Sequence, residues 1–267
     1  MPDPVDAVAA ELIDLDARPR LLPAFAPRYP GFDTAAGYRT AERVHAHRLS
    51  AGWKPVGRKI GFTNRTIWPR YGVYEPMWGY VYDRTLVQAS AQRATVDLSG
   101  LVQPRIEPEV CFGLKAAPRA RDAAALLDAI EWVAHSIEIV HCHHPDWKLQ
   151  IPDCTAANGL HGRLILGAPV ALGDLPGLEQ ALPKLEVALM KGGVEIDRGV
   201  GANVLDSPLA AFGYLVGLLA GRPPHALQAG EIVSTGTLTD AHPVAAGEIW
   251  TTAFSGIALP GLSVEFR

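Results

Sequence analysis

Apolar residues at the start of the chain recur at the spacing of an amphipathic helix. Within residues 4–17 they fall three or four positions apart, which places them on one face of a helix. A proline-rich connection over residues 18–30 leads to a second predicted helix over residues 34–49. Asp33 is suited to cap the start of this helix, and Gly52 is suited to end it. The pattern therefore predicts a helical N-terminal region.

After Gly52 the helical spacing gives way to short apolar runs that are typical of strands. These runs are rich in β-branched and aromatic residues, and Gly and Pro separate them. The segment Lys191-Gly192-Gly193-Val194 predicts a tight hairpin turn. The predicted strands are residues 56–62, 79–82, 86–88, 106–114, 136–141, 163–166, 184–191, 194–200, 230–234, 248–252 and 262–266.

Two further helices are predicted among the strands. One covers residues 121–133 and the other residues 207–220, where Ser207 supplies an N-cap and Pro208 takes the first helical position. Many strands with few helices indicate an α+β protein that is mostly β. We therefore expect two parts, a helical N-terminal region over residues 1–55 and a β-rich domain over residues 56–267.

Composition limits the class of function. The 267 residues are 48% hydrophobic and 19% charged, as in a globular protein with a sizeable core. The net charge is −4, and neither a basic cluster nor a long apolar run is present, so we expect no nucleic-acid partner and no membrane contact. The three cysteines lack metal-binding spacing, and the first residues are unlike a signal peptide. A cytoplasmic protein with reduced thiols is expected.

Two acidic residues share one predicted strand. Side chains at Glu107 and Glu109 would point to the same face, about 6.7 Å apart along the backbone. Neighbouring carboxylates repel each other unless one is protonated or a cation lies between them. Pro108 cannot donate to a sheet ladder, so this strand is expected to lie at an edge or to carry a bulge. The alternative is an ordinary solvent-exposed edge strand without function.

A third acid, Glu138, stands in an apolar run of another predicted strand. An ionised carboxylate in such surroundings needs a partner. If the two strands are neighbours, Glu107, Glu109 and Glu138 form an all-oxygen face for a hard divalent cation. Mg²⁺ or Mn²⁺ suits such a face. The three acids together predict a metal site.

Other polar residues have both a functional and an ordinary interpretation. Lys59 precedes an apolar stretch, so its ammonium group either serves the metal site or reaches solvent along the surface. Thr235-Gly236-Thr237 offers hydroxyl and amide groups that suit a carboxylate, or it forms a plain turn. Lys148 and Asp153 are expected to pair, either as a buried ion pair beside the metal or as a salt bridge within a loop.

Four stretches together resemble the fumarylacetoacetase superfamily, in its 2-keto-4-pentenoate hydratase / 4-oxalocrotonate decarboxylase branch. The resemblance spans about residues 5–265, and its specificity comes from the order and spacing of the motifs. The stretches are Lys59-Ile60-Gly61-Phe62-Thr63, Ile106-Glu107-Pro108-Glu109, Ile137-Glu138-Ile139-Val140 with Asp146-Trp147-Lys148 and Pro152-Asp153 downstream, and Gly230-Glu231-Ile232-Val233-Ser234-Thr235-Gly236-Thr237.

The resemblance implies a mixed β-roll or sandwich with a helical N-terminal region, and a homo-oligomer. It also implies Mg²⁺ or Mn²⁺ bound by Glu107, Glu109 and Glu138, with a 2-oxo or 2-hydroxy acid completing the coordination. The expected catalytic residues are Lys59, Lys148, Asp153 and His161. The expected substrate-binding residues are Gly61, Thr63, Thr235, Gly236 and Thr237.

One departure from the family pattern bears on the reaction. Ala157 stands where the hydratases are expected to have Asp, and His161 either takes over a polar role or is a surface imidazole. The first hypothesis is hydration of a 2-hydroxy-2,4-dienoate in the catabolism of aromatic or related compounds. The alternatives are decarboxylation of a 4-oxalocrotonate-like acid, C–C hydrolysis of an acylpyruvate or β-diketone by a His–carboxylate pair, and a non-catalytic partner subunit.

Overall fold

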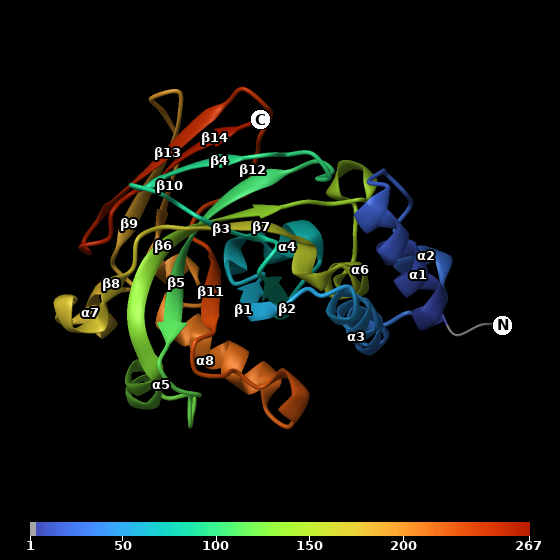
Figure 1. Cartoon of the computed structure of the whole chain (residues 1–267), viewed down its shortest axis with the longest axis horizontal. Helices are drawn as coiled ribbons and strands as arrows, with labels where there is room; N and C mark the ends of the chain where they lie inside the picture. Colours follow the sequence, from blue (N-terminus) through green and yellow to red (C-terminus); the bar gives the residue numbers. More distant parts are fainter. Residues whose placement is uncertain (1–3) are drawn as a thin grey trace.

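Two β-sheets and a group of helices at one end make up the protein (Figure 1). The computed structural model describes residues 4–267, without the side chains of residues 67, 70 and 71. The N-terminal helices lie to the right in Figure 1, and the chain ends in the upper sheet. The predicted α+β fold, mostly β with a helical N-terminal region, is confirmed.

The larger sheet has strongly curved central strands and carries most of the predicted β-segments (Figure 1). Its order is β2-β1-β11-β5-β6-β7-β3, with β12 paired to β5 and β8 paired to β6. Its strands are β1 (Pro55–Gly61), β2 (Met77–Tyr82), β3 (Leu86–Gln88), β5 (Arg105–Leu114), β6 (Ile130–Val140), β7 (His161–Leu166), β8 (Val170–Ala171), β11 (Ile232–Thr237) and β12 (His242–Pro243).

The smaller sheet packs over one end of β5 and β6. Its order is β10-β9-β13-β14-β4. Between the sheets lies an apolar core in which Ile106 and Ile137 contact a cluster with Leu189 and Trp250, and burial of such side chains stabilises the layered arrangement. Its strands are β4 (Arg93–Val96), β9 (Glu186–Lys191), β10 (Val194–Val200), β13 (Ile249–Ser255) and β14 (Ser263–Phe266).

Helices cover the ends and one face of the larger sheet. α8 packs against β11, with Phe212 and Leu215 buried in the main core. The α-helices are α1 (Pro4–Ala17), α2 (Phe25–Arg28), α3 (Thr34–Ser50), α4 (Trp68–Tyr71), α5 (Ala123–Ala129), α6 (Ile151–Ala156), α7 (Leu178–Ala181) and α8 (Pro208–Leu219). The 3₁₀ turns are η1 (Arg65–Ile67), η2 (Pro145–Trp147), η3 (Asn158–Leu160), η4 (Leu172–Asp174), η5 (Gly201–Asn203) and η6 (Pro223–His225).

Several local signals acted as expected. The Asp33 side chain accepts the Ala36 amide at the start of α3, and Ser207 caps α8 ahead of Pro208. Gly192 and Gly193 take φ values of 55° and 85° in a two-residue hairpin between β9 and β10. These positive φ values are why the turn uses glycine.

The predicted helix over residues 121–133 is wrong in its second half. Helix α5 ends at Ala129, and β6 begins at Ile130 and pairs with β5. Pairing along the whole length of β5 outweighs the local helical spacing there. Helix α6 and strand β4 were not predicted: α6 is short and has Pro152 in its first turn, and residues 93–96 are half polar.

The N-terminal helices are joined to the rest of the fold. α3 packs against both α1 and α6. The carboxylate of Asp153 in α6 accepts the backbone amides of Phe25 and Ala26 at 2.7 and 3.0 Å. The boundary between a region over residues 1–55 and a domain over 56–267 stays a prediction. Within residues 4–267, no helix is long and apolar enough to cross a bilayer.

Candidate active site

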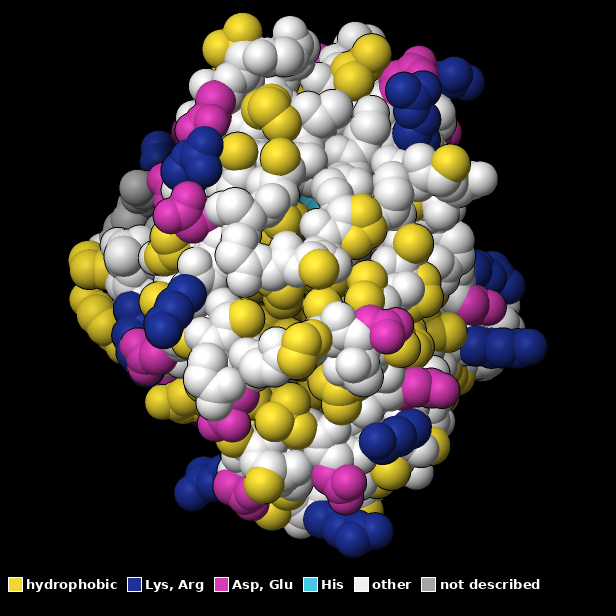
Figure 2. Space-filling model, turned by 90° about the vertical axis from the view of Figure 1, so that its left-hand side faces the viewer, with side chains coloured by type: hydrophobic (Ala, Val, Ile, Leu, Met, Phe, Trp, Pro, Cys, Tyr) yellow, Lys and Arg dark blue, Asp and Glu magenta, His cyan; other side chains and the backbone are white. Residues whose placement is uncertain are grey.

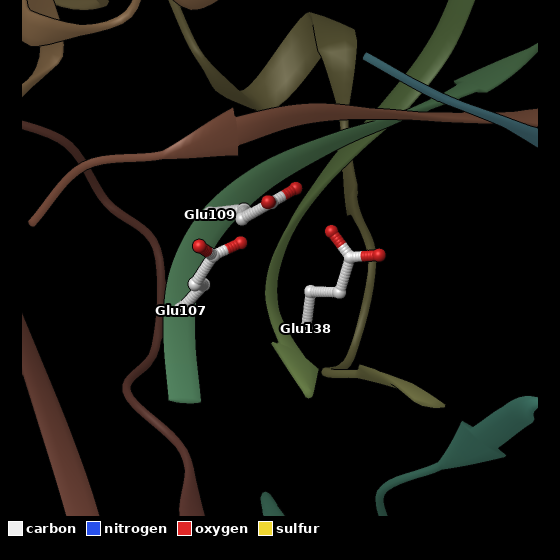
Figure 3. A group of neighbouring side chains, drawn as sticks. All are labelled: Glu107, Glu109 and Glu138. Carbon is white, nitrogen blue, oxygen red and sulfur yellow. The ribbon is translucent and has the colours of Figure 1, made fainter. Parts of the chain in front are cut away.

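The pairing of β5 with β6 brings the three predicted acids together. Glu107 lies directly opposite Glu138 in the ladder, and Glu109 follows two residues later on the same face. Figure 3 shows the three carboxyl groups turned toward one another from the two strands. Each offers an oxygen, and these oxygens lie within 4.8 Å of one another. The expected convergence of the acids is therefore confirmed.

The irregularity near Pro108 lies in a neighbouring strand. The ladder between β5 and β11 changes register between Ser234 and Thr237, opposite Val110, so the extra residue belongs to β11. Pro108 stays in register with Ile137 of β6, and its carbonyl accepts the Leu238 amide just after β11 ends. The predicted edge is wrong, because β11 and β6 flank β5, and the predicted bulge lies in β11 and not in β5 at Pro108.

Glu109 has the most unusual environment of the three. It is fully buried, and its Oε2 accepts hydrogen bonds from the Ser234 hydroxyl and, at 3.1 Å, from the Gly236 amide. Its Oε1 is buried without a hydrogen bond. Burial, and then the charges of Glu138 and Glu107, raise the pKa of Glu109 well above its usual range. A proton or a cation is needed beside that oxygen.

The other two acids respond in opposite directions. Burial and the Glu138 charge raise the pKa of Glu107, which is half-buried at the cavity wall, to about 7. Burial would also raise the pKa of Glu138, but Lys59 and His161 outweigh it and lower that pKa. Glu138 is therefore ionised at neutral pH. The all-oxygen donor set and the unsatisfied Oε1 of Glu109 both fit a hard divalent cation.

Lys59 is the cation beside this acidic cluster. It is 3% exposed, and its Nζ donates to the Gly159 carbonyl at 2.9 Å and lies 3.1 Å from Glu138 Oε2. The second contact is a buried ion pair. Burial would lower the pKa of Lys59, but the three carboxylates outweigh it and raise that pKa. Of the two alternatives for Lys59, the one in which its ammonium group reaches solvent is wrong.

A left-handed turn supplies the carbonyl that holds Lys59. Asn158, Gly159 and Leu160 have φ values of 54°, 64° and 63°. The Asn158 side chain fixes the turn by accepting the Tyr80 amide at 2.7 Å and donating to the Tyr80 carbonyl at 2.9 Å. The turn thus delivers the Gly159 oxygen to the ammonium group.

His161 supports the third acid from behind. Its Nδ1 lies 2.7 Å from Glu138 Oε1, and its Nε2 lies 2.8 Å from the Thr85 hydroxyl oxygen. Burial lowers the pKa of His161 despite the Glu138 charge, and the neutral ring with its proton on Nδ1 donates to the Glu138 carboxylate. The surface-imidazole interpretation is wrong, because His161 is 6% exposed.

A cavity opens in front of Lys59 and Glu107. Four of the predicted substrate-binding residues line it: Gly61, Thr63, Gly236 and Thr237. The buried hydroxyl of Thr63 has no hydrogen-bond partner, so it is available to a ligand. The other lining residues are Lys59, Phe62, Asn64, Glu107, Val140, Trp147, Leu149, Gly159, Leu160, Asp240 and Ala241.

Three of the expected site residues, Thr235, Lys148 and Asp153, do not line the cavity. The Thr235 hydroxyl donates to the Val110 carbonyl, because alternation along β11 turns it away from the face that Ser234 shares with Glu109. Lys148 is exposed and pairs with Asp146 at 3.3 Å.

Asp153 is buried in α6 and accepts the Gln150 amide in a capping box, besides bonding α2. The expected pairing of Lys148 with Asp153 is therefore wrong in both of its forms.

Sequence reasoning missed the residues that support or enclose the site. Ser234 lies in the stretch Gly230–Thr237, one residue before Thr235. Because adjacent residues of a strand point to opposite faces, its side chain could have been expected to face the acids if that of Thr235 did not. Thr85 and Leu149 carry no local signal, and the motif that contains Trp147 assigned no role to it, since only the tertiary fold brings these residues to Glu138 or the cavity.

A substitution at Gly236 tests the close approach of β11 to β1. A Cβ at Gly236 would lie 1.9 Å from Thr63 Oγ1, and the residue has a φ of 97°. We expect Gly236→Ala to lower the free energy of unfolding by about 2 kcal/mol or more. Gly230→Ala is the matched control, since its φ is 83° and nothing lies within 4 Å. Equal losses in the two variants, measured by thermal melting, would contradict the close approach.

A pH effect on metal binding follows from the raised pKa values. The pKa of Glu107 lies at about 7 and that of Glu109 well above its usual range, so protons compete with a cation as the pH falls. The melting-temperature increase caused by Mg²⁺ should therefore grow from pH 6 to pH 8, with affinity changing by up to about tenfold per pH unit per displaced proton. An increase of the same size at both pH values would show that no proton is displaced.

The raised pKa of Glu107 also makes the stability of the metal-free protein depend on pH. The folded-state pKa of Glu107 is above the ordinary value of 4.5, so the contribution of this group to stability is fully present below about pH 4.5. The contribution is lost as the pH rises through about 7. Comparison with and without Mg²⁺ at each pH removes the contributions of groups that do not contact the cation.

Known proteins with similar sequences cover nearly the whole chain. The chain is 30% identical over 257 residues to 2-keto-4-pentenoate hydratase 1 of Dechloromonas aromatica, covering 94% of each chain. It is 29% identical over 258 residues to a 4-oxalocrotonate decarboxylase of a Pseudomonas species, covering 96% of this chain and 94% of that one. No protein-family model matches the chain.

Solved structures agree with the sequence comparison. The 4-oxalocrotonate decarboxylase of Pseudomonas putida G7, in complex with magnesium and adipate, matches with a TM-score of 0.88 and 28% identity over 98% of this chain and 97% of that one. A fumarylacetoacetate isomerase/hydrolase candidate from Oleispira antarctica shares the fold, with a TM-score of 0.59 and 15% identity over 79% of this chain and 94% of that one. The chain therefore belongs to the fumarylacetoacetase superfamily, in the branch of the 2-keto-4-pentenoate hydratases and 4-oxalocrotonate decarboxylases.

Proposed function

We propose that the protein is a divalent-metal-dependent lyase that adds water to a 2-hydroxy-2,4-dienoate, in the catabolism of aromatic or related compounds. The observation that carries the proposal is the buried cluster of three glutamates beside Lys59, at the wall of a cavity. The hydratases and decarboxylases among the similar proteins support the reaction class.

Glu107, Glu109 and Glu138 would hold Mg²⁺ or Mn²⁺. When bound, the cation would supply Lewis acidity to the carboxylate and the 2-oxygen of the substrate. The Ser234 hydroxyl and the Gly236 amide fix the Glu109 carboxylate, and His161 fixes Glu138. Such supporting hydrogen bonds hold the acids in one geometry before a cation arrives.

Lys59 is the residue assigned to charge and proton handling. Its ammonium group stays protonated beside the acids, because their charges raise its pKa. During the reaction the 2-hydroxyl loses a proton, the far carbon of the diene gains one, and water adds across the remaining conjugated bond. Lys59 can return the proton to carbon or hold the substrate carboxylate, and the free Thr63 hydroxyl can donate to that carboxylate.

The alternatives within the superfamily share part of this machinery. Decarboxylation of a vinylogous keto acid uses the same electron flow toward the 2-oxygen, so it remains the second candidate, and several similar proteins are named 4-oxalocrotonate decarboxylase. C–C hydrolysis requires a His–carboxylate pair aimed at the substrate. His161 does pair with Glu138, but its Nε2 faces Thr85 and the ring does not line the cavity. The geometry therefore favours a lyase.

We also propose that the protein forms a homo-oligomer. Figure 2 shows the face on the side of α7 and β8, where hydrophobic side chains gather in the middle and charged ones lie toward the edge. Val170 on β8 and Leu172 on η4 are partly buried apolar residues of these segments. A second copy would cover such a face. Light scattering should give a mass that is a multiple of 28.6 kDa.

The test of the lyase proposal is an assay of the purified chain with 2-hydroxypenta-2,4-dienoate, 4-oxalocrotonate and an acylpyruvate. Hydration predicts loss of dienoate absorbance without release of carbon dioxide. Chelation should abolish this turnover, and added Mg²⁺ or Mn²⁺ should restore it. Absence of turnover by the isolated, metal-supplied chain would instead favour a non-catalytic partner subunit.

A further inference from the structure

His135 is a fully buried histidine that takes no part in the proposed reaction. It lies on β6, the strand that carries Glu138, and it is not one of the described residues that line the cavity. Side chains alternate along a strand, so His135 shares a face with Ile137 in the core between the two sheets, whereas Glu138 points to the acidic cluster (Figure 3). The His135 ring contacts the Phe254 ring of β13, with the centroids 4.6 Å apart. The imidazole therefore stands between the larger sheet and the smaller one.

Both ring nitrogens of His135 have polar partners. Nδ1 lies 2.9 Å from the backbone carbonyl oxygen of Glu109, and Nε2 lies 2.8 Å from the Thr252 hydroxyl oxygen on β13. A carbonyl can only accept, so Nδ1 carries a hydrogen and donates to Glu109. Burial lowers the pKa of His135 to about 4, so the ring is neutral at pH 7 and Nε2 is left as an acceptor. The Thr252 hydroxyl can donate to it, because the other acceptor near that hydroxyl, the Leu262 carbonyl, is farther away at 3.4 Å.

The contact with Glu109 falls where the larger sheet is irregular. The ladder between β5 and β11 shifts register between Glu109 and Cys111 of β5, and such a shift disrupts the regular backbone pairing. Side chains from the two flanking strands donate to successive carbonyls of β5 at this place. His135 on β6 donates to the Glu109 carbonyl, and Thr235 on β11 donates to the Val110 carbonyl at 2.8 Å. These donors hold the backbone from which the Glu109 carboxylate extends.

The chain of hydrogen bonds continues into the smaller sheet. The Thr252 hydroxyl oxygen accepts the Leu262 amide at 2.9 Å, and the Thr252 amide donates to the Leu262 carbonyl at 2.9 Å. Thr252 is thereby fixed between β13 and the segment that leads into β14. A continuous path of hydrogen bonds runs from Leu262 through Thr252 and His135 to the backbone of Glu109.

We propose that His135 is a positioning residue of the metal site, which fixes the backbone of Glu109 and makes the place of that ligand depend on the smaller sheet. The inference rests on the proposed function, in which Glu109 is a metal ligand. The Ser234 hydroxyl and the Gly236 amide orient the carboxylate of this residue, and the His135 ring holds its main chain. Groups that orient a ligand raise metal affinity, because the ligand is in place before the cation arrives.

Replacement of His135 with leucine and with asparagine tests this role through Mg²⁺ affinity. Leucine removes both ring nitrogens, whereas the side-chain nitrogen of asparagine is bonded to Cγ, as Nδ1 is, and can still donate to the Glu109 carbonyl. In titration calorimetry well below the melting temperature, we expect His135→Leu to weaken Mg²⁺ binding by about tenfold or more. His135→Asn should restore most of the affinity. Unchanged affinity in folded His135→Leu, or equal losses in the two variants, would overturn the proposal.

Val264→Ala separates positioning from a general loss of stability. Val264 lies on β14 and is fully buried in the core between the sheets. Its truncation should lower the melting temperature, as His135→Leu should, but it should leave Mg²⁺ affinity unchanged. If Val264→Ala weakened Mg²⁺ binding as much as His135→Leu, loss of stability would account for both effects and the proposal would fail.

Thr252 gives an independent pair of variants should His135→Leu fail to fold. Thr252→Val removes the hydroxyl that meets Nε2, and Thr252→Ser keeps it. We expect Thr252→Val to weaken Mg²⁺ binding, by a smaller factor than His135→Leu does, and Thr252→Ser to retain the wild-type affinity. Equal affinities in the two Thr252 variants would overturn the dependence on the smaller sheet.

The tautomer of His135 gives a readout that needs no metal. In protein with isotope-labelled histidine, the nitrogen NMR signals that His135→Asn lacks belong to this ring, and we expect them to show the hydrogen on Nδ1. A hydrogen on Nε2 instead would refute the contact with Glu109. Wild-type protein that does not bind Mg²⁺ would contradict the proposed function and this inference with it. Equally tight Mg²⁺ binding by the wild type and His135→Leu would refute the inference alone.

Discussion

Replacing Glu109 with glutamine should abolish turnover while leaving the metal-free protein folded. The Glu109 carboxyl has a strongly raised pKa, so removing its charge relieves repulsion from Glu107 and Glu138. The amide oxygen of glutamine can still accept from Ser234 and Gly236. The metal-free variant should therefore melt at the same temperature as the wild type or higher.

Loss of the same charge should remove metal binding and activity together. Carboxylate number sets the affinity of an oxygen site for a hard cation. A bound cation contributes several kcal/mol to stabilising developing charge. Since about 1.4 kcal/mol is tenfold in rate, kcat/KM should fall by at least about 10³-fold. The Mg²⁺-induced increase in melting temperature should disappear.

Glu131→Gln is the control for this prediction. Glu131 lies on β6, as Glu138 does, but it is exposed and distant in register from the acidic cluster. Its substitution should change neither activity nor the response to Mg²⁺. If Glu109→Gln kept the full Mg²⁺-induced increase in melting temperature, ligation by Glu109 would be refuted.

The acidic cluster was predictable because it depends on rules that act within and between neighbouring strands. The two-residue period places Glu107 and Glu109 on one face whatever the rest of the fold does. The apolar surroundings of Glu138 required a partner, and a strand neighbouring β5 could supply one. Pro108 indicated an irregularity in the ladder, but the register shift lies in the neighbouring strand β11, where the sequence carries no indication of it.

The roles expected for Lys148 and Asp153 were wrong because the conformation of the neighbouring residues sets the direction of both side chains. Asp146 and Trp147 both have positive φ, 56° and 58°, which turns the chain and sends Lys148 into solvent. Asp153 stands three residues after Gln150, a spacing that also describes a capping box. The capping box explains why an acidic residue is buried at position 153 without a metal ion nearby.

The apolar part of the cavity wall was not predicted, although Gly61, Thr63, Gly236 and Thr237 of the same wall were. Phe62 follows β1, Val140 ends β6, and Leu160 lies in η3. They meet only because β1 and β6 belong to one curved sheet and the turn at Asn158 packs against β2. Strand order is a tertiary property, so no periodicity in the sequence reports it. Phe62 and Val140 stand in motifs, but only the tertiary fold shows that their side chains line one cavity.

The largest combined loss of stability and activity is expected for Lys59→Met. The substitution removes a buried ammonium group and leaves Glu138 with His161 as its remaining polar partner. Breaking a buried ion pair in this way costs about 3 kcal/mol or more, so the variant should melt well below the wild type in a chelator. Loss of the proposed proton donor should lower kcat by about 10²–10⁴-fold.

Addition of Mg²⁺ distinguishes the structural role of Lys59 from the catalytic one. A divalent cation among three carboxylates replaces the missing positive charge, so Mg²⁺ should raise the melting temperature of Lys59→Met more than that of the wild type. Activity should stay low in the Mg²⁺-stabilised variant. Lys54→Met, which removes an exposed lysine just before β1, should leave both properties unchanged. Recovery of activity along with stability would assign Lys59 to the fold alone, and the proton would then have to come from solvent.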